Sequence, residues 1–308
     1  MNTNSRWTEI KLRVPTGWQE LVADSLGQAV CTTVQIGDHD PLAAPAPPGS
    51  TYVRTYIPTS QDSPAWRSAL QTTLQDLATR VGVEELGAIE ATYTILPQED
   101  YANSWKKSWK AFRLRRPNGS LRVEPPWSAL PDRDGETRLI LEPGGAFGSG
   151  RHATTRTCLG VVLERLRGEE RVLDAGSGSG ILAVTSVLLG AAQATGFDVD
   201  AVATQSAQEL AATNQVTDRT HFFTGGMESI PSTSFDIVFA NIYSDVIVEH
   251  AHRLAGALAP QGWFAFSGCP SHHRDKTRDA ILGAGLSIDE ERRRGRWCTF
   301  VGTHAGQD

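Results

Sequence analysis

A glycine-rich turn between an apolar strand and an apolar helix constrains the fold of this chain most. The segment reads Val172-Leu173-Asp174-Ala175-Gly176-Ser177-Gly178-Ser179-Gly180-Ile181-Leu182. Glycine lets the backbone approach a ligand closely, and N–H groups at the start of a helix favour an anionic group. In open parallel sheets, ligands bind at such strand-to-helix turns. The segment therefore predicts an α/β fold with a ligand site at this turn.

The chain from residue 121 onwards alternates between predicted strands and helices. Strands are expected at 121–123, 138–141, 172–174, 194–197, 221–223, 237–240 and 263–267, and helices at 154–166 and from positions 181, 201, 244 and 271. This alternation predicts a doubly wound parallel sheet. The last two strands, 286–293 and 297–303, are separated only by a short turn at Gly295, which leaves no room for a crossover helix. We therefore expect them to pair antiparallel at the end of the sheet.

Residues 6–96 show a different pattern. Ile10, Leu12 and Val14 alternate with Lys11 and Arg13, which is typical of a half-buried strand. Further strands are expected at 31–36, 52–57 and 89–95, with helices at 18–26 and, from the start signal Ser63-Pro64, at 63–81. The order βαββαβ predicts a small ferredoxin-like α+β domain. We therefore divide the chain into an N-terminal domain over 1–96, a linker helix and connection over 97–120, and a larger domain over 121–308.

A predicted helix over 99–112 joins the two domains. It carries Trp105 and Trp109 four residues apart, together with Lys106, Lys107 and Lys110. Packing between the domains is the favoured explanation for the two tryptophans, and peptide binding is the alternative.

The charge and the cysteine content bear on the class of function. The net charge of −6 gives no hint of the basic surface of a nucleic-acid-binding domain, so we expect no direct nucleic-acid binding. None of the four cysteines forms a CxxC pair, so no metal site is expected, and scattered cysteines fit a reducing compartment. The N-terminus lacks an apolar signal segment, and no apolar run is long enough to span a bilayer. We therefore expect a cytoplasmic protein without membrane association.

The spacing of the glycines separates two kinds of nucleotide site. A dinucleotide-binding loop of the GxGxxG type would need glycine where this chain has Ile181. Instead, Asp174 is followed by Gly176, Gly178 and Gly180. This spacing resembles the cofactor loop of S-adenosylmethionine-dependent methyltransferases more than a nicotinamide site. A tight turn that binds no ligand is the structural alternative.

Polar residues end two of the predicted parallel strands. Asp198 ends the strand after the glycine turn, where a carboxylate can accept both ribose hydroxyls of a nucleoside. Asp200 is better explained as the cap of the next helix. Asn241 ends the fourth parallel strand and is expected beside the reacting methyl group, with a helix cap or turn as the alternative. The sequence Asn241-Ile242-Tyr243-Ser244 lacks the prolines found here in enzymes that methylate amide or base nitrogens, which disfavours a glutamine or nucleobase acceptor.

A second glycine-rich segment precedes the helix at 154–166. It reads Leu141-Glu142-Pro143-Gly144-Gly145-Ala146-Phe147-Gly148-Ser149-Gly150-Arg151-His152-Ala153-Thr154-Thr155. By its position it can cover a bound cofactor, and Thr155 can offer its hydroxyl to a methionine carboxylate, with a helix cap at Thr154 or Thr155 as the alternative. This segment resembles the LDPGxAFGTGxHPTT motif of the PrmA family of ribosomal-protein methyltransferases. The similarity extends to the 174–182 loop, to 196–200, to 240–242, to Trp297-Cys298 and to the two-domain layout.

The resemblance implies a class I S-adenosylmethionine-dependent methyltransferase. Its seven-stranded Rossmann-like domain would follow a ferredoxin-like substrate-recognition domain. The family's cofactor contacts fall on Thr155, Gly176, Asp198 and Asn241. The resemblance also implies methylation of lysine side-chain and N-terminal amino groups of the large-subunit ribosomal protein L11. The motif differs at positions 142, 149 and 153, and a related lysine methyltransferase branch acts on an electron-transfer flavoprotein subunit, which is the alternative substrate.

The expected reaction is an in-line displacement at the sulfonium methyl by a neutral amine. A lysine with a pKa near 10.4 loses its proton at pH 7 at a cost of roughly 4–5 kcal/mol, and desolvation beside a cationic cofactor lowers that cost. Alignment then supplies most of the catalysis, and Phe147 and Asn241 are expected to shape the acceptor pocket. His152 is a possible base, although a structural hydrogen bond in its loop is the favoured explanation. A nicotinamide oxidoreductase and a catalytically silent ribosome-binding module are the alternatives from other classes.

Overall fold

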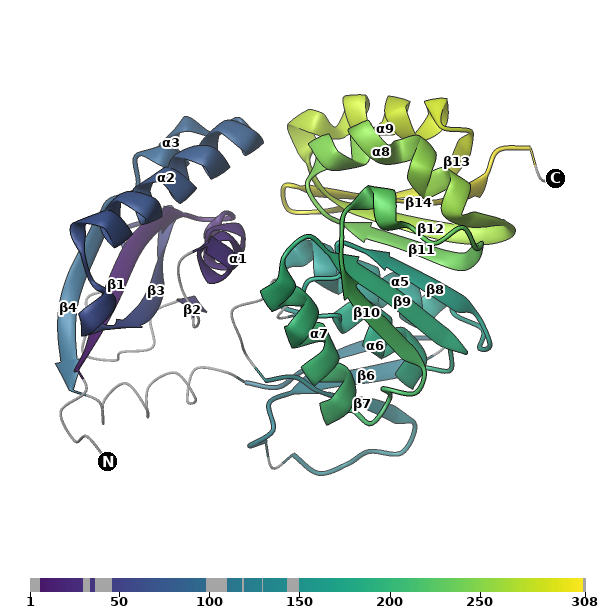
Figure 1. The fold of residues 1–308 in the computed structure, drawn as a ribbon, viewed down its shortest axis with the longest axis horizontal. Coiled ribbons are helices and arrows are strands. Elements are labelled where there is room, and N and C mark those ends of the chain that lie inside the picture. Colours follow the sequence, from purple (N-terminus) through teal and green to yellow (C-terminus); the bar gives the residue numbers. More distant parts are fainter. Residues whose placement is uncertain are drawn as a thin grey trace. The chain divides into compact units, whose positions relative to one another are not determined.

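The described part of the chain divides into two compact units. The computed structural model describes residues 6–29, 34–36, 46–97, 110–117, 119–128, 130–142 and 150–306. The first unit ends at Lys110 and the second begins at Ala111 (Figure 1). Phe147, most of the glycine-rich segment before residue 150, the tryptophans of the predicted linker helix and Cys31 lie outside the described residues.

The first unit contains a four-stranded antiparallel sheet with the strand order β2-β3-β1-β4. Its elements are β1 (Arg6–Pro15), α1 (Gln19–Ala29), β2 (Val34–Ile36), β3 (Ser50–Pro58), η1 (Thr59–Gln61), α2 (Pro64–Val81), α3 (Glu84–Gly87) and β4 (Ala91–Pro97). Apart from the short η1 and α3, this is the βαββαβ order that the sequence predicts, and the sheet order is that of a ferredoxin-like arrangement.

The local sequence explains why these elements form. In β1, Ile10, Leu12 and Val14 are fully buried while the residues between them are partly or fully exposed, as expected for period-two alternation. In α2, the hydroxyl of Ser63 accepts a hydrogen bond from the third residue of the helix and proline occupies the first helical position. The helix ends at Gly82, whose φ of 66° lies in the left-handed region that glycine adopts without strain.

The second unit is built on a seven-stranded sheet with the strand order β10-β9-β8-β11-β12-β14-β13. Its strands are β8 (Arg171–Ala175), β9 (Gln193–Asp198), β10 (Thr220–Thr224), β11 (Phe235–Asn241), β12 (Leu258–Pro270), β13 (Leu286–Arg294) and β14 (Trp297–His304). Strands β8 to β12 pair in parallel, whereas β14 is antiparallel to both β12 and β13. The structure therefore confirms the predicted doubly wound sheet and its terminal antiparallel hairpin.

One helix precedes β8, and further helices follow β8, β9, β11 and β12. They are α5 (Ala153–Arg165), α6 (Ile181–Leu188), α7 (Ala201–Thr213), α8 (Ser244–Ala257) and α9 (Arg274–Gly283), with short η2 (Met227–Ser229) and η3 (Ser271–His273) turns. The chain passes from β8 to β9 on one side and later returns to β11 on the other side of β8. This change of direction places a topological switch point at the carboxyl ends of β8 and β11, where ligands bind in such sheets.

Residues 112–120 are not the simple connection that the sequence predicted. Phe112–Arg116 forms strand β5, which pairs antiparallel with β6 (Gly119–Glu124), and β6 pairs in parallel with β7 (Glu136–Ile140). Leu114 is buried opposite Leu121. The five-residue strand contains three arginines, and two of them find their carboxylate partners at Glu136 and Glu164. Because these partners are distant in sequence, the local pattern could not reveal the strand.

No helix in the described ranges is both long and apolar enough to cross a membrane.

Candidate cofactor and acceptor site

The glycine turn after β8 requires glycine at three alternate positions. Gly176, Gly178 and Gly180 have φ angles of 73°, 53° and 76°, all in the left-handed region. A Cβ on Gly176 would lie 2.2 Å from the Cγ2 of Ile242, and a Cβ on Gly180 would lie 2.8 Å from the Cβ of Ala207. The turn is therefore held against neighbouring segments by contacts that leave no room for side chains.

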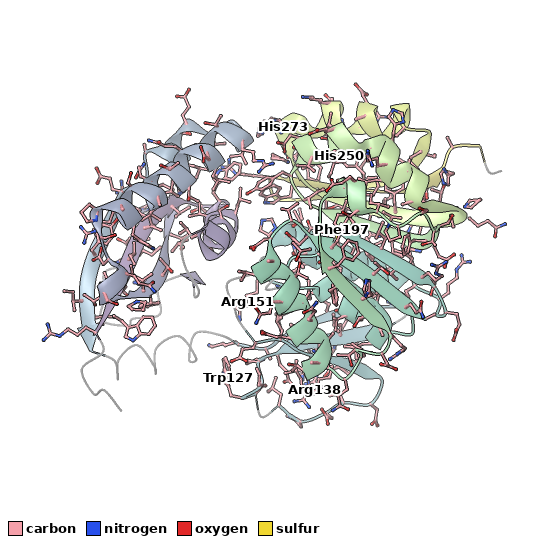
Figure 2. All side chains as sticks on the ribbon, in the orientation of Figure 1. Trp127, Arg138, Arg151, Phe197, His250 and His273 are labelled. Atoms are coloured by element: carbon pink, nitrogen blue, oxygen red, sulfur yellow. The ribbon has the colours of Figure 1, made fainter. Side chains whose placement is uncertain are left out.

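The first N–H groups of this turn bind the neighbouring strand. Gly176 and Ser177 both donate to the carbonyl of Phe197 at 2.9 Å, and Gly178 donates to the carboxylate of Asp198 at 2.9 Å. Phe197 is labelled in Figure 2. These three N–H groups, which lie before the first residue of α6 (Ile181–Leu188), bind the neighbouring strand β9. They fix the shape of the turn, and a ligand can approach its backbone closely.

Asp198 lies at the end of β9, where the sequence predicted a ribose contact. Its Oδ2 accepts from Gly178, and its Oδ1 accepts from the N–H of Asp200 at 3.0 Å. Each carboxylate oxygen has a second lone pair that these bonds leave available. The residue is half-buried, so the remaining lone pairs are within reach of a ligand. Asp200 caps α7 by accepting from Val202 at 2.8 Å, as predicted.

Asp174 lies beneath the turn rather than at its surface. Its side chain is 1% exposed, and its Oδ2 accepts from the N–H of Ala183 at 3.2 Å. Burial raises the pKa of this carboxyl from an ordinary value of 3.8 to about 7, and the Asp198 carboxylate adds to the rise. A carboxyl in this position ties the start of α6 to the end of β8.

Replacing Asp174 with asparagine is expected to remove a pH-dependent loss of stability. Between pH 3.8 and about pH 7 the folded state keeps a proton that the unfolded state releases, so the free energy of unfolding falls as the pH rises. A difference of about three pKa units corresponds to about 4 kcal/mol at most. Urea unfolding at several pH values should show the wild-type protein losing stability relative to Asp174→Asn as the pH rises. A difference that stays constant across this range would contradict the raised pKa.

Asn241 and Thr155 form a hydrogen bond at the switch point. Asn241 ends β11, and its Nδ2 donates to the Oγ1 of Thr155 on α5 at 3.2 Å, which joins residues 86 apart in sequence. Asn241 is 7% exposed and Thr155 is fully buried. Within the described ranges, the Oδ1 of Asn241 has no hydrogen-bond partner although it is buried. A buried acceptor without a donor costs free energy, so this oxygen fits a donor supplied by a ligand.

His152 has a structural role. Its Nδ1 accepts from the N–H of Thr154 at 3.3 Å, so it caps α5, a role that the sequence had offered to Thr154 or Thr155. Burial lowers the pKa of His152 to about 3, so the ring is neutral near pH 7. The ring also packs edge-on against Trp297 with a centroid distance of 4.9 Å. The favoured explanation of His152 as a structural residue is confirmed, and it is a poor candidate for the base.

Sequence analysis did not identify three features around this site. Val199, directly after Asp198, is 78% exposed and offers an apolar surface next to the Asp198 carboxylate, the candidate ribose contact. Ser177 is 7% exposed, and its Oγ has no hydrogen-bond partner among the described residues. The third feature is a hydrogen bond between Ser244 and His273. An apolar residue immediately after the acid of a strand end was a signal that could have revealed Val199, whereas the other two depend on tertiary contacts.

The residues present fit a cationic nucleoside cofactor better than a metal ion. The glycine turn forms a cradle without side chains, and two buried oxygens, Ser177 Oγ and Asn241 Oδ1, lack partners within the described residues. Among the described residues, no group of three His, Cys, Asp or Glu side chains is placed so that it could hold a metal ion. The arrangement can therefore hold a ribose on Asp198 and present a hydrogen-bond acceptor, Asn241 Oδ1, at the adjacent strand end.

Comparisons with known proteins agree with this geometry. The family model described as ribosomal protein L11 methyltransferase (PrmA) matches residues 6–305. A ribosomal protein L11 methyltransferase of Streptococcus equi subsp. zooepidemicus is 32% identical over 306 residues, covering 96% of this chain and 95% of that protein. The corresponding protein of Pelobacter propionicus is 32% identical over 309 residues, covering 96% and 97%. The crystal structure of a ribosomal protein L11 methylase from Lactobacillus delbrueckii subsp. bulgaricus superposes with a TM-score of 0.54 at 26% identity, covering 60% of this chain and 95% of that chain.

Proposed function

Since this chain belongs to the ribosomal protein L11 methyltransferase family, we propose that it transfers methyl groups from S-adenosylmethionine to amino groups of ribosomal protein L11. The acceptors are lysine side chains and the N-terminal α-amino group. The observation that carries this proposal is the buried, unpartnered Oδ1 of Asn241 among the described residues, next to the glycine turn. Because L11 is a ribosomal protein, the proposed reaction takes place in the cytoplasm.

The cofactor site follows from the residues around the glycine turn. Asp198 would bind the two ribose hydroxyls with its remaining lone pairs, and Val199 would cover one face of the purine with its exposed side chain. The backbone of Gly176, Gly178 and Gly180 would lie against the methionine part, with the hydroxyl of Thr155 as a donor to its carboxylate. Bound S-adenosylmethionine supplies an electrophilic methyl group on a positively charged sulfur.

Asn241 would orient the acceptor amine. A neutral amine has one lone pair for attack and N–H groups that can donate, and Asn241 Oδ1 is an acceptor for one of them. The bond from Asn241 Nδ2 to Thr155 at 3.2 Å fixes which way the amide faces. With one N–H bonded to Asn241, the lone pair of the amine would be free to point at the methyl group of the cofactor. Methyl transfer needs this alignment. Phe147, which lies outside the described residues, is the proposed apolar wall of the acceptor pocket.

Incubation with tritiated S-adenosylmethionine and purified ribosomal protein L11 tests this function. Label in lysine and N-terminal amines, located by mass spectrometry of the peptides, is the expected result. An electron-transfer flavoprotein subunit serves as the comparison substrate, although that alternative is not favoured, because the relatives matched along almost the whole chain are named for L11. Calorimetry with S-adenosylhomocysteine, run in parallel, separates loss of cofactor binding from a wrong choice of substrate. Binding of that product without label in L11 would overturn the substrate assignment.

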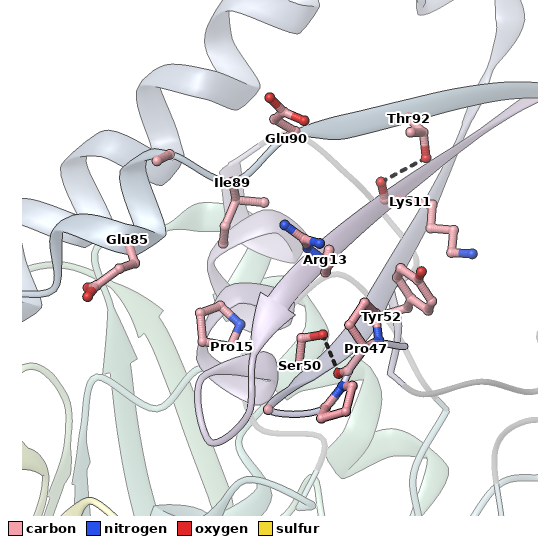
Figure 3. A pocket seen from close by; sticks show the side chains of 13 residues that line it. Lys11, Arg13, Pro15, Pro47, Ser50, Tyr52, Glu85, Ile89, Glu90 and Thr92 are labelled. Carbon is pink, nitrogen blue, oxygen red and sulfur yellow. Dashed lines mark hydrogen bonds between the residues drawn. The ribbon is translucent and has the colours of Figure 1, made fainter. Parts of the chain in front are cut away.

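We further propose that the first unit recognises the protein substrate through a groove on its sheet (Figure 3). The groove has a volume of about 700 Å³, and charged and aromatic side chains line it, among them Lys11, Arg13, Tyr52, Glu85 and Glu90. The Nζ of Lys11 lies 3.6 Å from the ring centre of Tyr52. Hydrogen bonds from Ser50 to Pro47 and from Thr92 to the carbonyl of Lys11 hold the rim. Positive and negative side chains beside an aromatic ring can pair with the mixed charges and apolar groups on the surface of a folded protein.

Reversing the charge of Arg13 is expected to weaken binding of the protein substrate. Arg13 is exposed at the groove, so Arg13→Glu should raise the KM for L11 by about 5- to 20-fold, the size expected for one or two rim contacts. The kcat at saturating L11 and the affinity for S-adenosylhomocysteine should not change. Arg80→Glu, an exposed position in the last turn of α2 outside the groove, is the matched control and should leave the KM within about twofold. Equal KM values for the two variants would exclude this groove as the recognition surface.

A further inference from the structure

A serine and a histidine that follow two neighbouring strands form a hydrogen-bonded pair. Ser244 is the first residue of α8 and is 4% exposed. Its Oγ lies 2.9 Å from the Nδ1 of His273, the last residue of η3. Thr277 donates to the carbonyl of His273 at 3.0 Å, so its backbone is fixed as well. The reaction proposed above assigns no role to Ser244 or His273.

The pair follows the carboxyl ends of two parallel strands of the sheet. Strands β11 and β12 run in parallel, and Asn241 at the end of β11 is directly beside Ser267 of β12. Ser244 is the third residue after Asn241, and His273 follows the end of β12. Helix α8 begins at Ser244 and helix α9 directly after His273, and the two helices pack side by side (Figure 1). Figure 2 labels His273 at the α8–α9 side of the second unit. The pair therefore follows the carboxyl ends of β11 and β12, the same edge of the sheet at which Asn241 lies.

The second ring nitrogen of His273 is available. Within the described ranges no hydrogen bond involves its Nε2, and the side chain is half-buried. Burial lowers the pKa of His273, and the neighbouring His272 and Lys276 lower it further, whereas Asp245 at the start of α8 raises it. The ring of His272 packs edge-on at a centroid distance of 4.3 Å. A neutral imidazole with one nitrogen anchored and the other open can accept a proton.

We propose that His273, anchored by Ser244, accepts the proton that the substrate ammonium group must lose before methyl transfer. This proposal rests on the proposed function, since it assigns a proton acceptor to the amine of that reaction. The Nε2 of His273 takes one proton from the ammonium group, which becomes a neutral amine, and the ring becomes an imidazolium. The Nδ1–H of the imidazolium donates to Ser244 Oγ, so both ring protons have a place. The proton then passes to water. The nitrogen of the neutral amine would take the methyl group, and the sulfur would leave as the neutral thioether of S-adenosylhomocysteine.

The dependence of the rate on pH distinguishes this role from a structural one. In His273→Ala, single-turnover methylation of L11 at pH 7 should fall by about 100-fold, the lower end of the usual range for a positioned base. The rates of variant and wild type should converge as the pH approaches about 10, where a substantial fraction of a lysine amine with a pKa near 10.4 is already neutral. Added imidazole should restore part of the rate at pH 7 in His273→Ala. His272→Ala removes the adjacent exposed ring and is the matched control. It should keep a rate near wild type at pH 7, with a pH profile moved to slightly higher pH, because His272 lowers the pKa of His273.

Three measurements keep the outcomes apart. Calorimetry with S-adenosylhomocysteine should give the same affinity for His273→Ala and His273→Gln as for the wild type, because His273 does not belong to the proposed cofactor site. Thermal unfolding should show both variants folded at the assay temperature, with a lower midpoint for His273→Ala, which loses the bond to Ser244. His273→Gln can still bond to Ser244 but cannot take up a proton, so it should be as slow as His273→Ala at pH 7. A wild-type rate in either variant, or a deficit that is equal at every pH, would overturn the role of His273. A wild-type protein that binds the cofactor but does not methylate L11 would instead overturn the proposed function.

Discussion

Replacing Asn241 with alanine should lower the kcat for methylation of L11 by about 100- to 1000-fold, the range measured when one oriented polar group is removed from an active site. The affinity for S-adenosylhomocysteine should change by no more than a few-fold. The reason is that Asn241 Oδ1 is buried without a partner among the described residues. It therefore gains its hydrogen bond only when the acceptor amine binds. Stopped reactions with tritiated cofactor give kcat, and calorimetry gives the affinity.

Two companion variants show whether orientation is the cause. Thr155→Val keeps the shape of the side chain but removes the oxygen that accepts from Asn241 Nδ2 at 3.2 Å, so the amide loses its fixed orientation. We expect a kcat at saturating S-adenosylmethionine about 10-fold below wild type, since a small misplacement of a catalytic group is enough for such a loss. Cofactor binding should also weaken, because the same hydroxyl is the proposed donor to the cofactor's carboxylate. Ser267→Ala removes a hydroxyl beside Asn241 that bonds Thr299 instead, and it should leave kcat within about threefold. If Asn241→Ala were as active as Ser267→Ala, the role of Asn241 would be refuted.

Replacing Asp198 with alanine should weaken binding of S-adenosylhomocysteine by about 100- to 10 000-fold. Two hydroxyl hydrogen bonds to a carboxylate are worth roughly 1.5–3 kcal/mol each, and their loss gives a change of this size. The variant also deprives the N–H of Gly178 of its acceptor at 2.9 Å, so the glycine turn loses one of its anchors. Calorimetric titration measures the affinity directly.

The neighbouring Asp200 offers a control of the same residue type. Its carboxylate caps α7 and has no place in the proposed ribose contact. Asp200→Ala should reduce the free energy of unfolding by about 1 kcal/mol, as for other helix caps, and should leave the affinity for S-adenosylhomocysteine within about twofold. Equal losses of affinity in the two variants would mean that Asp198 acts through the stability of this region rather than through the ribose.

The extent to which the site could be predicted differs between its parts. The glycines at 176, 178 and 180 and the acid at 198 were predictable because a turn that needs left-handed φ angles is encoded in adjacent residues. Asn241 was predictable because its strand has an apolar pattern that ends there. The use of the loop N–H groups was not predictable, since their acceptors, Phe197 O and Asp198, belong to the next strand and depend on the register of the sheet.

The sequence by itself determined most of the described strands and helices, the parallel pairing in the larger sheet, the antiparallel final hairpin and the left-handed glycine positions. These features depend on local periodicity and on the dihedral angles of single residues, so they can be read along the chain. Only the tertiary structure decided that Phe112–Arg116 is a strand, and that Arg122, 1% exposed, lies buried beside Glu124 and Glu136.

The tertiary structure also decided which distant side chains meet. Thr155 reaches Asn241 across 86 residues, and Ser244 reaches His273 across 29. The physical reason is that a hydrogen bond between side chains needs its atoms within about 3 Å. Such a distance is set by strand register and helix packing, which arise from the whole fold rather than from any one segment.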